Sequence, residues 1–312
     1  MGSNPIGPTD SGRAGYGTRP ADEPAGQDVP PDQDMPAHHH VPADNHVHSQ
    51  WSHDTGPRAS MAAACARAVA LGLPAVAFTE HLDFTDWGPD DPIAGTGITP
   101  NDQWGPRPFD VRGYLSCLDE CRGRFPSLRI LSGAEAGEPH LFAGSAAAVL
   151  SSGRFDRILG SVHTLPSRGR LVYARALLRR EPADALMRRY FAEVVAMIEG
   201  SDLFEVLAHL DYPRRYWPEA AGRYQEQDFE EEYRAVLRAL ASSGRVLELN
   251  TASPLVSVSL LRWWREEGGR ALSFGSDAHL PGYVGERFAE AAGLAEAAGF
   301  RPGRDPFDFW RG

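Results

Sequence analysis

The feature that most restricts the possible folds is a series of short apolar runs that alternate with amphipathic helical stretches from residue 43 onward. The apolar runs predict strands at Asn45–His48, Ala75–Thr79, Ile130–Glu135, Arg157–Val162, Leu203–Ala208, Val246–Asn250 and Ala271–Ser276. The stretches that follow them predict helices at Arg58–Leu71, Asp110–Phe125, Leu141–Ser151, Pro182–Glu199, Asp228–Ser242, Val256–Glu267 and Gly285–Ala298. Strand–helix units in series favour a parallel sheet with crossover helices. We therefore predict an α/β fold with a closed barrel of parallel strands, and an open doubly wound sheet is the structural alternative.

Two segments of the chain lack this periodicity. Residues 1–42 are rich in Pro, Gly, Asp and Ala, which predicts a disordered tail before a barrel domain at 43–312. Three adjacent histidines at 38–40 end the tail, and we interpret them as incidental rather than as metal ligands. The stretch Asp83–Phe109 is also rich in Pro, Gly and Asp, and a loop of that length in a compact domain is often an active-site flap.

Composition excludes several classes of function. The formal net charge of -11 argues against a nucleic-acid partner, because proteins that bind phosphate backbones usually present a basic face. Metal ions can still give an acidic protein a local positive charge for an anionic substrate. The sequence contains no lysine. Schiff-base chemistry, a P-loop lysine and a carboxylated lysine that bridges two metals are therefore impossible.

The same totals give an expectation for the cellular compartment. Cys65, Cys117 and Cys121 form no CxxC pair, which predicts reduced thiols in a reducing compartment. No apolar run is long enough to cross a bilayer, and the N-terminal residues lack a signal pattern. We therefore expect a cytoplasmic protein without a membrane partner, and the sequence leaves its oligomeric state open.

The strongest chemical signal is the pair His46 and His48 at the end of the first predicted strand, followed by His53. In an extended segment, residues two apart point to the same side, so both imidazoles of the pair face one direction. This arrangement offers two ligands to one metal ion, and His53 could reach a neighbouring ion. The alternative is a pair of strand histidines satisfied by hydrogen bonds.

Later strands also deliver metal-binding residue types at their carboxyl ends. These residues are His81, Glu135, His163, His209, Asp277 and His279. Active sites of parallel barrels assemble at that end, so the pattern predicts a multinuclear metal site. Nitrogen and carboxylate ligands without thiolate suit zinc, manganese or iron. Two or three ions bridged by Glu135 and Asp277, about 3.5–4 Å apart, could hold a nucleophilic hydroxide. We assign catalytic roles to Glu135, Asp277 and His279.

Arginines close to these strand ends are candidates for contact with a phosphate, because the guanidinium fork pairs with two oxygens. Arg214 and Arg215 follow His209 by a few residues, and a solvated pair at a helix start is the alternative. The rivals for the same role beyond His163 are Arg168, Arg170 and Arg175.

Three further polar residues lie at strand ends. Glu80 could orient the neighbouring His81 or contact substrate. Asn250 and Glu248 end the sixth predicted strand, and either could meet the polar end of a substrate. Glu248 could equally form a structural ion pair.

Taken together, these motifs resemble the PHP (polymerase and histidinol phosphatase) superfamily, and within it the histidinol-phosphatase branch. The matching segments are His46-Val47-His48 with His53, Phe78-Thr79-Glu80-His81, Gly133-Ala134-Glu135, Gly160-Ser161-Val162-His163, Ala208-His209-Leu210-Asp211, Glu248-Leu249-Asn250-Thr251 and Gly275-Ser276-Asp277-Ala278-His279. The resemblance implies a distorted (β/α)7 TIM-like barrel with up to three metal ions at its C-terminal face. By motif it implies a first ion on His46, His48, Glu135 and Asp277, a second on His53, His81 and His279, and a third on Glu135, His163 and His209.

The resulting functional hypothesis is a metal-dependent phosphatase that hydrolyses a small phosphate monoester. The first candidate reaction, from histidine biosynthesis, converts L-histidinol phosphate to L-histidinol and phosphate. Alternatives are another sugar or nucleotide phosphate, an oligonucleotide end, or a catalytically silent metal-binding regulatory protein. A carbon–nitrogen hydrolase on a similar barrel is disfavoured, because its usual bridging lysine is missing.

Overall fold

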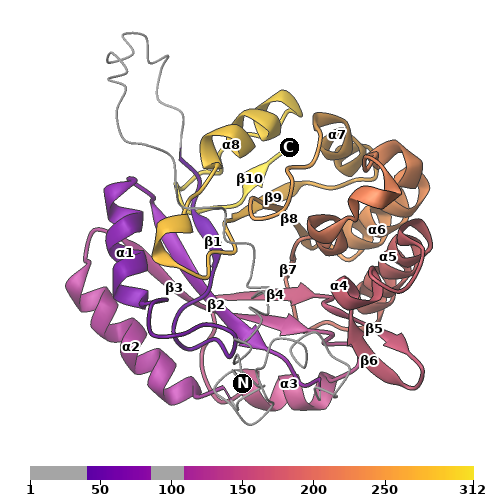
Figure 1. Ribbon diagram of the computed structural model, residues 1–312. Coiled ribbons are helices and arrows are strands. Elements are labelled where there is room, and N and C mark those ends of the chain that lie inside the picture. Colours follow the sequence, from indigo (N-terminus) through magenta and orange to yellow (C-terminus); the bar gives the residue numbers. More distant parts are fainter. Residues whose placement is uncertain (1–40, 86–108) are drawn as a thin grey trace, which may run out of the picture.

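Within residues 41–85 and 109–312, which the computed structural model describes, eight strands form one curled sheet in the order β1-β2-β3-β4-β7-β8-β9-β10 (Figure 1). The strands of this sheet are β1 (Asp44–Val47), β2 (Ala75–Leu82), β3 (Arg129–Gly137), β4 (Arg157–Ser161), β7 (Val206–Leu207), β8 (Val246–Asn250), β9 (Ala271–Gly275) and β10 (Trp310–Arg311). All neighbours pair in parallel except β10, which is antiparallel to β9. The predicted parallel sheet is therefore confirmed.

The first and the last parallel strands meet where the sheet curls closed. The His48 amide donates to the Ala278 carbonyl at 2.9 Å, and the Asp277 amide donates to the His46 carbonyl at 2.7 Å. Val47 and Ala278 form an isolated parallel bridge. The barrel is thus closed over a short stretch only, which agrees with the predicted distorted barrel and excludes the open-sheet alternative.

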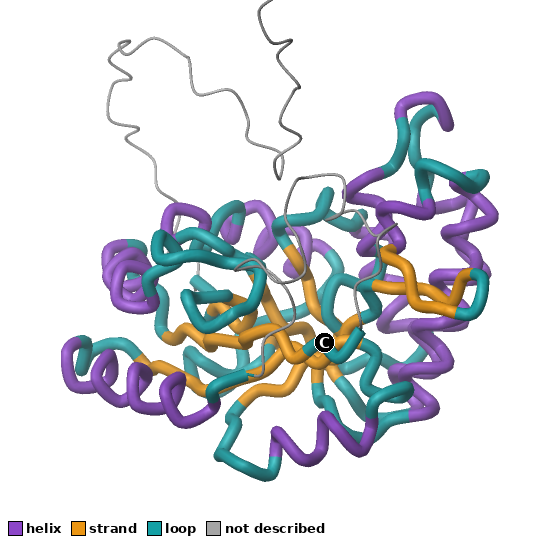
Figure 2. Tube along the Cα trace, turned by 60° about the horizontal axis from the view of Figure 1, so that its bottom comes forward, coloured by secondary structure: helices purple, strands orange, loops and turns teal. Residues whose placement is uncertain are grey.

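Helices surround the strands on the outside of the barrel (Figures 1 and 2). They are α1 (Met61–Ala70), α2 (Val111–Arg124), α3 (Ala143–Leu150), α4 (Ala174–Leu177), α5 (Ala183–Gly200), α6 (Glu230–Ser242), α7 (Val258–Glu266) and α8 (Phe288–Ala297). Except for the short α4, each lies where the sequence predicts a helix. Their apolar faces account for this: α6, for example, buries Tyr233, Val236, Leu237 and Leu240, which recur at helical spacing.

Side-chain caps fix where three of the helices begin. Ser60 accepts a hydrogen bond from the Ala63 amide ahead of α1, and Ser257 accepts one from the Leu260 amide ahead of α7. Asp110 caps α2 in the same way. Such caps satisfy amides that have no partner within the first turn.

The sequence did not predict a hairpin between the fourth and fifth barrel strands. It consists of β5 (Thr164–Ser167) and β6 (Arg170–Tyr173), and α4 follows directly. Its two turn residues, Arg168 and Gly169, have φ values of 51° and 80°. Left-handed residues at both central positions match the tight turn that joins antiparallel strands. Short 3-10 helices, also unpredicted, are η2 (Tyr212–Tyr216), η3 (Glu219–Ala221), η4 (Glu226–Phe229) and η5 (Pro281–Tyr283).

A buried carboxylate ties the start of β1 to the chain that follows β9. Asp44 Oδ1 accepts from the Ser276 amide at 2.9 Å, and Oδ2 accepts from the Gly285 amide at 3.0 Å. Burial raises the pKa of Asp44 to about 6 despite these hydrogen bonds. The contacts hold both sides of the barrel closure next to the residues that the sequence selects as ligands.

The predicted tail lies outside the described residues except for 41 and 42, and so do its histidines at 38–40. Most of the predicted flap, residues 86–108, lies outside them as well. Among the described helices, none is long and apolar enough to cross a membrane.

Candidate metal centre

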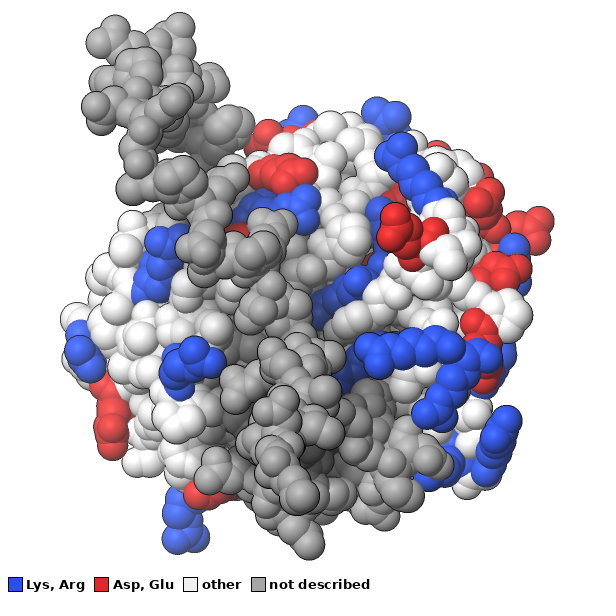
Figure 3. All heavy atoms as spheres, viewed as in Figure 1, with Lys and Arg blue, Asp and Glu red and all other residues white. Residues whose placement is uncertain are grey.

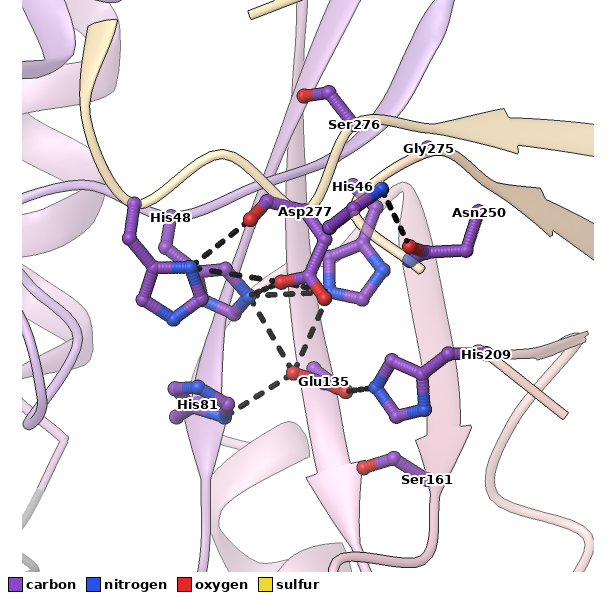
Figure 4. A network of polar contacts seen from close by, with 12 residues as sticks. His46, His48, His81, Glu135, Ser161, His209, Asn250, Gly275, Ser276 and Asp277 are labelled. Atoms are coloured by element: carbon purple, nitrogen blue, oxygen red, sulfur yellow. Dashed lines mark hydrogen bonds and ion pairs between the residues drawn. The ribbon is translucent and has the colours of Figure 1, made fainter. Parts of the chain in front are cut away.

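His46 and His48 converge at the end of β1, on the inside of the barrel (Figure 4). Their Nε2 atoms are 3.1 Å apart, and both residues are almost fully buried. The intervening Val47 points to the other side and packs in the hydrophobic core. The alternation of a strand therefore produces the paired imidazoles that the sequence predicted.

Glu135, at the carboxyl end of β3, stands between two groups of histidines. Its Oε2 lies 3.1–3.4 Å from ring nitrogens of His46, His48 and His81. Its Oε1 lies 2.8 Å from His209 Nε2 and 3.3 Å from His163 Nε2. The side chain is fully buried. A carboxylate in this position can share its two oxygens between neighbouring ions.

Asp277 faces the same histidines from the end of β9. Its Oδ1 is 3.3 Å from His48 Nε2 and 3.6 Å from His46 Nε2. Asp277 has a φ of 52°, a left-handed conformation that aspartate tolerates better than most residues. Strained backbone of this kind is concentrated at functional sites.

Glu248 is a buried carboxylate that contacts both His46 and His209. Glu248 Oε1 lies 2.7 Å from His46 Nδ1, and Glu248 Oε2 accepts from the His209 amide at 2.6 Å. Gly275 leaves the space for this carboxylate, because a Cβ at Gly275 would overlap Glu248 Oε1 and the His46 Cβ. Glu248 therefore orients ligand candidates, and the ion-pair interpretation of this residue fits better than contact with substrate.

Glu80 is also placed differently from the expectation. It is fully buried and does not line the cleft, and its oxygens accept hydrogen bonds from Ser49 and Ser52. Ser52 Oγ lies 3.0 Å from His48 Nδ1. Glu80 thus supports His48 through Ser52, and its buried position does not fit the expected contact with substrate.

The outer part of the site contains His53, His81 and His279 together with two aspartates that the sequence analysis did not select. Asp54 Oδ2 lies 3.0 Å from His279 Nε2 and 3.4 Å from His81 Nε2. Asp83 Oδ2 lies 2.8 Å from His53 Nε2. A signal for Asp83 was present, because it follows His81 by two residues and so falls on the same side of an extended segment.

Burial and the surrounding charges shift the pKa values of the ligand candidates in different directions. Burial lowers the pKa of His279, but Asp54 and Asp277 outweigh it and raise this pKa to about 10. Burial, followed by the nearby His81 and His279, lowers the pKa of His48 to about 3, so its imidazole is neutral. Burial alone would raise the pKa of Glu135, but His46, His163 and His81 outweigh it and hold this pKa well below its usual range. Neutral imidazoles and ionised carboxylates are the forms that bind metals, so His48 and Glu135 are already in the binding form, whereas His279 has to release a proton when an ion binds.

All nine predicted ligands belong to overlapping groups that could hold metal ions. The groups are His48, His81 and His279; His46, His209 and Asp277; His46, His48 and Glu135; His53, His81 and Asp83; and His81, Glu135 and His163. Within each group the potential ligand atoms lie within 4.8 Å of one another. The donor set is nitrogen and oxygen only, which fits zinc, manganese or iron.

A cleft opens above these groups. Besides the ligand candidates, its wall contains Tyr173, Arg175, Tyr212, Arg215 and Tyr216. They come from the hairpin, α4 and η2, the elements that the sequence did not predict. On the face seen in Figure 3, arginine side chains gather over the region of α4, α5 and β6.

The candidate arginines differ in whether they line the cleft. Arg215 lines the cleft, and its Nη2 donates to Asp277 Oδ2 at 2.5 Å and to Asn250 Oδ1 at 3.0 Å. Arg214 is instead paired with Asp211 and Glu226, at 3.1 and 2.8 Å. Arg175 also lines the cleft, whereas Arg168 and Arg170 do not. Asn250 is buried behind Arg215 and is not part of the cleft wall.

A family model described as the PHP domain matches residues 44–252, which is more than half of the chain. The chain belongs to the PHP domain family. This PHP chain is 25% identical over 233 residues to the "Probable histidinol-phosphatase" of Clostridium acetobutylicum, a match that covers 73% of the chain and 83% of that relative. It is 25% identical over 262 residues to the histidinol-phosphatase of Lactococcus lactis, and this match covers 81% and 90% of the two chains.

A solved structure has the same fold. It is the histidinol phosphate phosphatase of Lactococcus lactis complexed with zinc, L-histidinol and phosphate. The TM-score is 0.68 at 23% identity, and the match covers 84% of this PHP chain and 95% of the other. The predicted PHP resemblance and the TIM-like fold are both confirmed.

Proposed function

We propose that this protein is a metal-dependent phosphatase that hydrolyses a small phosphate monoester, with L-histidinol phosphate as the first candidate. The observation that carries the proposal is the position of Glu135, whose two oxygens face two separate groups of histidines beside an arginine-lined cleft. The relatives named above support the choice of substrate.

The residues fit two or three divalent ions, which we propose to be zinc, manganese or iron. His46, His48, Glu135 and Asp277 would hold one ion. His53, His81 and His279 would hold another, and Glu135, His163 and His209 a third. Such ions supply Lewis acidity and activate water at neutral pH, so no covalent enzyme intermediate is required.

Arg215 is the best placed residue to bind the phosphate. Its guanidinium is held by Asp277 and Asn250 on Nη2, and its Nε donates to Ser253 Oγ at 2.6 Å. A fork fixed in this way can present its remaining N–H groups to phosphate oxygens without further loss of side-chain freedom. Arg175 would add a second positive charge on the cleft wall. Arg214 and Asn250 would act by holding this region in place.

Three tyrosines of the cleft wall would receive the organic part of the substrate. Tyr212 packs edge-on against Tyr216, with ring centroids 5.5 Å apart, and Tyr173 lines the same cleft. Aromatic faces suit a planar ring such as imidazole. The modest size of the cleft and the acidic charge of the chain argue against an oligonucleotide.

The test is phosphate release from L-histidinol phosphate, compared with a sugar phosphate, a nucleoside monophosphate and a generic aryl phosphate. We expect activity that a chelator abolishes and that Zn²⁺ or Mn²⁺ restores. The double variant His46→Ala/His48→Ala should lose activity, whereas His140→Ala, which removes a histidine paired with Glu193, should keep it. Metal uptake without hydrolysis of any of these esters would refute the proposal.

A further inference from the structure

The cleft contains a buried carboxylate that has no role in the nine-residue ligand set. Asp83 follows directly after β2, and 6% of its side chain is exposed. Its Oδ2 lies 2.8 Å from His53 Nε2 and 3.5 Å from His81 Nδ1. Its Oδ1 lies within ion-pair distance of His163 Nδ1, at 3.6 Å, and has no hydrogen-bond partner in the described part of the chain.

The neighbouring strand leaves space for this carboxylate. β2 and β3 pair in register up to Leu82 and Ala136, so Asp83 is next to Gly137. A Cβ built at Gly137 would overlap Asp83 Oδ1. The backbone of Gly137 is not in the left-handed region, so conformation does not require a glycine there. The missing side chain is what lets Asp83 point into the cleft.

The geometry of Asp83 resembles that of Glu135 in one respect. Each carboxylate directs one oxygen to His81 and the other to His163. His163 turns Nε2 to Glu135 and Nδ1 to Asp83, so the two carboxylates contact opposite edges of one ring. His163 can therefore bind an ion through Nε2 while Nδ1 is oriented by Asp83.

We propose that Asp83 is a further metal ligand: Oδ2 completes an ion site with His53 and His81, and Oδ1 orients His163 in the adjacent site. The inference rests on the metal centre proposed above. The three ligand atoms lie within 4.8 Å of one another. His53 Nε2 is the ring nitrogen that faces Asp83 Oδ2, so an ion bound by these two atoms would replace the hydrogen bond between them.

The experiment uses Asp83→Asn and Gly137→Ala in the full-length protein. Asparagine keeps the shape and one acceptor of Asp83 but removes the anionic ligand. The alanine methyl at Gly137 occupies the space of Asp83 Oδ1 and should displace the carboxylate without changing its chemistry. Gly144→Ala is the matched control, because a Cβ there meets no atom within 4 Å. Circular dichroism verifies that each variant is folded.

The measurements are zinc content per chain and competition with a chromophoric chelator. We expect both variants to lose one ion, with affinity for it reduced by more than about 100-fold, the upper end of what an outer partner of a ligand contributes. The double variant should be no worse than either single variant, because both remove the same contact. Gly144→Ala should bind zinc as the unmodified protein does.

Substitution with Co²⁺ gives a readout that is independent of activity and affinity. The visible absorption bands of the bound Co²⁺ should change in Asp83→Asn and Gly137→Ala and stay unchanged in Gly144→Ala. An unchanged spectrum, unchanged zinc content, or a loss of affinity of only about 10–100-fold would overturn the inference and leave Asp83 as an orienting residue. A protein that binds no zinc even without substitutions would instead refute the proposed metal centre itself.

Discussion

The floor and the wall of the cleft are built in different ways. By the floor we mean the strand-end ligand candidates at or just beneath the surface of the cleft, such as Glu135 on that surface and the buried His46 and His48 beneath it. Further carboxylates hold these side chains in place. The wall comes from short elements between strands, and Arg215 and Arg175 project from it. We infer from the comparison that the strand ends of the barrel carry the chemistry and that the segments between the strands select the substrate.

Glu135→Gln should have the largest effect, because both groups of histidines lose the carboxylate they share. We expect the rate of phosphate release to fall by more than about a thousandfold and the zinc content to fall with it. Activity assays together with elemental analysis provide the check. Near-normal activity of Glu135→Gln would contradict the inference that the floor carries the chemistry.

Arg215→Met should come next, with kcat/KM reduced by about 100-fold to 1,000-fold, because one phosphate donor and one partner of Asp277 are lost. The metals should remain bound, since the ligand set is intact. Steady-state kinetics with zinc analysis would separate this result from the Glu135 variant. Loss of zinc in Arg215→Met would show that the floor and the wall are not independent.

Arg175→Gln tests the cleft-wall residue that is farthest in sequence from any ligand candidate. We expect KM for the phosphate ester to rise by about tenfold with little change in kcat, the effect of about 1.4 kcal/mol of binding energy. Arg168→Gln, at the exposed hairpin turn, is the matched control and should leave both constants unchanged. An equal effect of the two variants would contradict a specific role for Arg175.

Arg214→Met should have the smallest effect on catalysis and act on stability instead. It leaves the buried Asp211 and Glu226 without the cation that pairs with both. We expect the free energy of unfolding to fall by roughly 2 kcal/mol and kcat/KM of the folded protein to change only a few-fold. Denaturant titration and kinetics test this. A loss of activity as large as that of Arg215→Met would reassign Arg214 to the substrate.

Much of the floor could be predicted from the sequence, because strand alternation and strand ends place side chains by simple geometry. His46 and His48 show this clearly: a spacing of two in an extended segment was enough to bring their nitrogens together. The seven parallel strands were predicted within a few residues, whereas the short antiparallel strand β10 was not predicted. The proposed metal roles remain predictions to be tested by the experiments above.

The wall could not be predicted in the same way. Arg214 and Arg215 are adjacent and identical in type, and only the 3-10 turn of η2 decides that one enters the cleft while the other pairs with Asp211. Glu80 reaches His48 through Ser52, a contact that depends on how the turn after β1 folds back. Asp83 was missed because it was counted as the start of a loop rather than as an extension of β2.

The short closure between β1 and β9 has a consequence for folding. His46 and His48 stand on one side of this seam and Asp277 on the other, joined by few backbone hydrogen bonds. A cation bound from both sides would add a cross-link at this short junction of the barrel. The thermal stability of the protein should therefore increase with the concentration of free zinc.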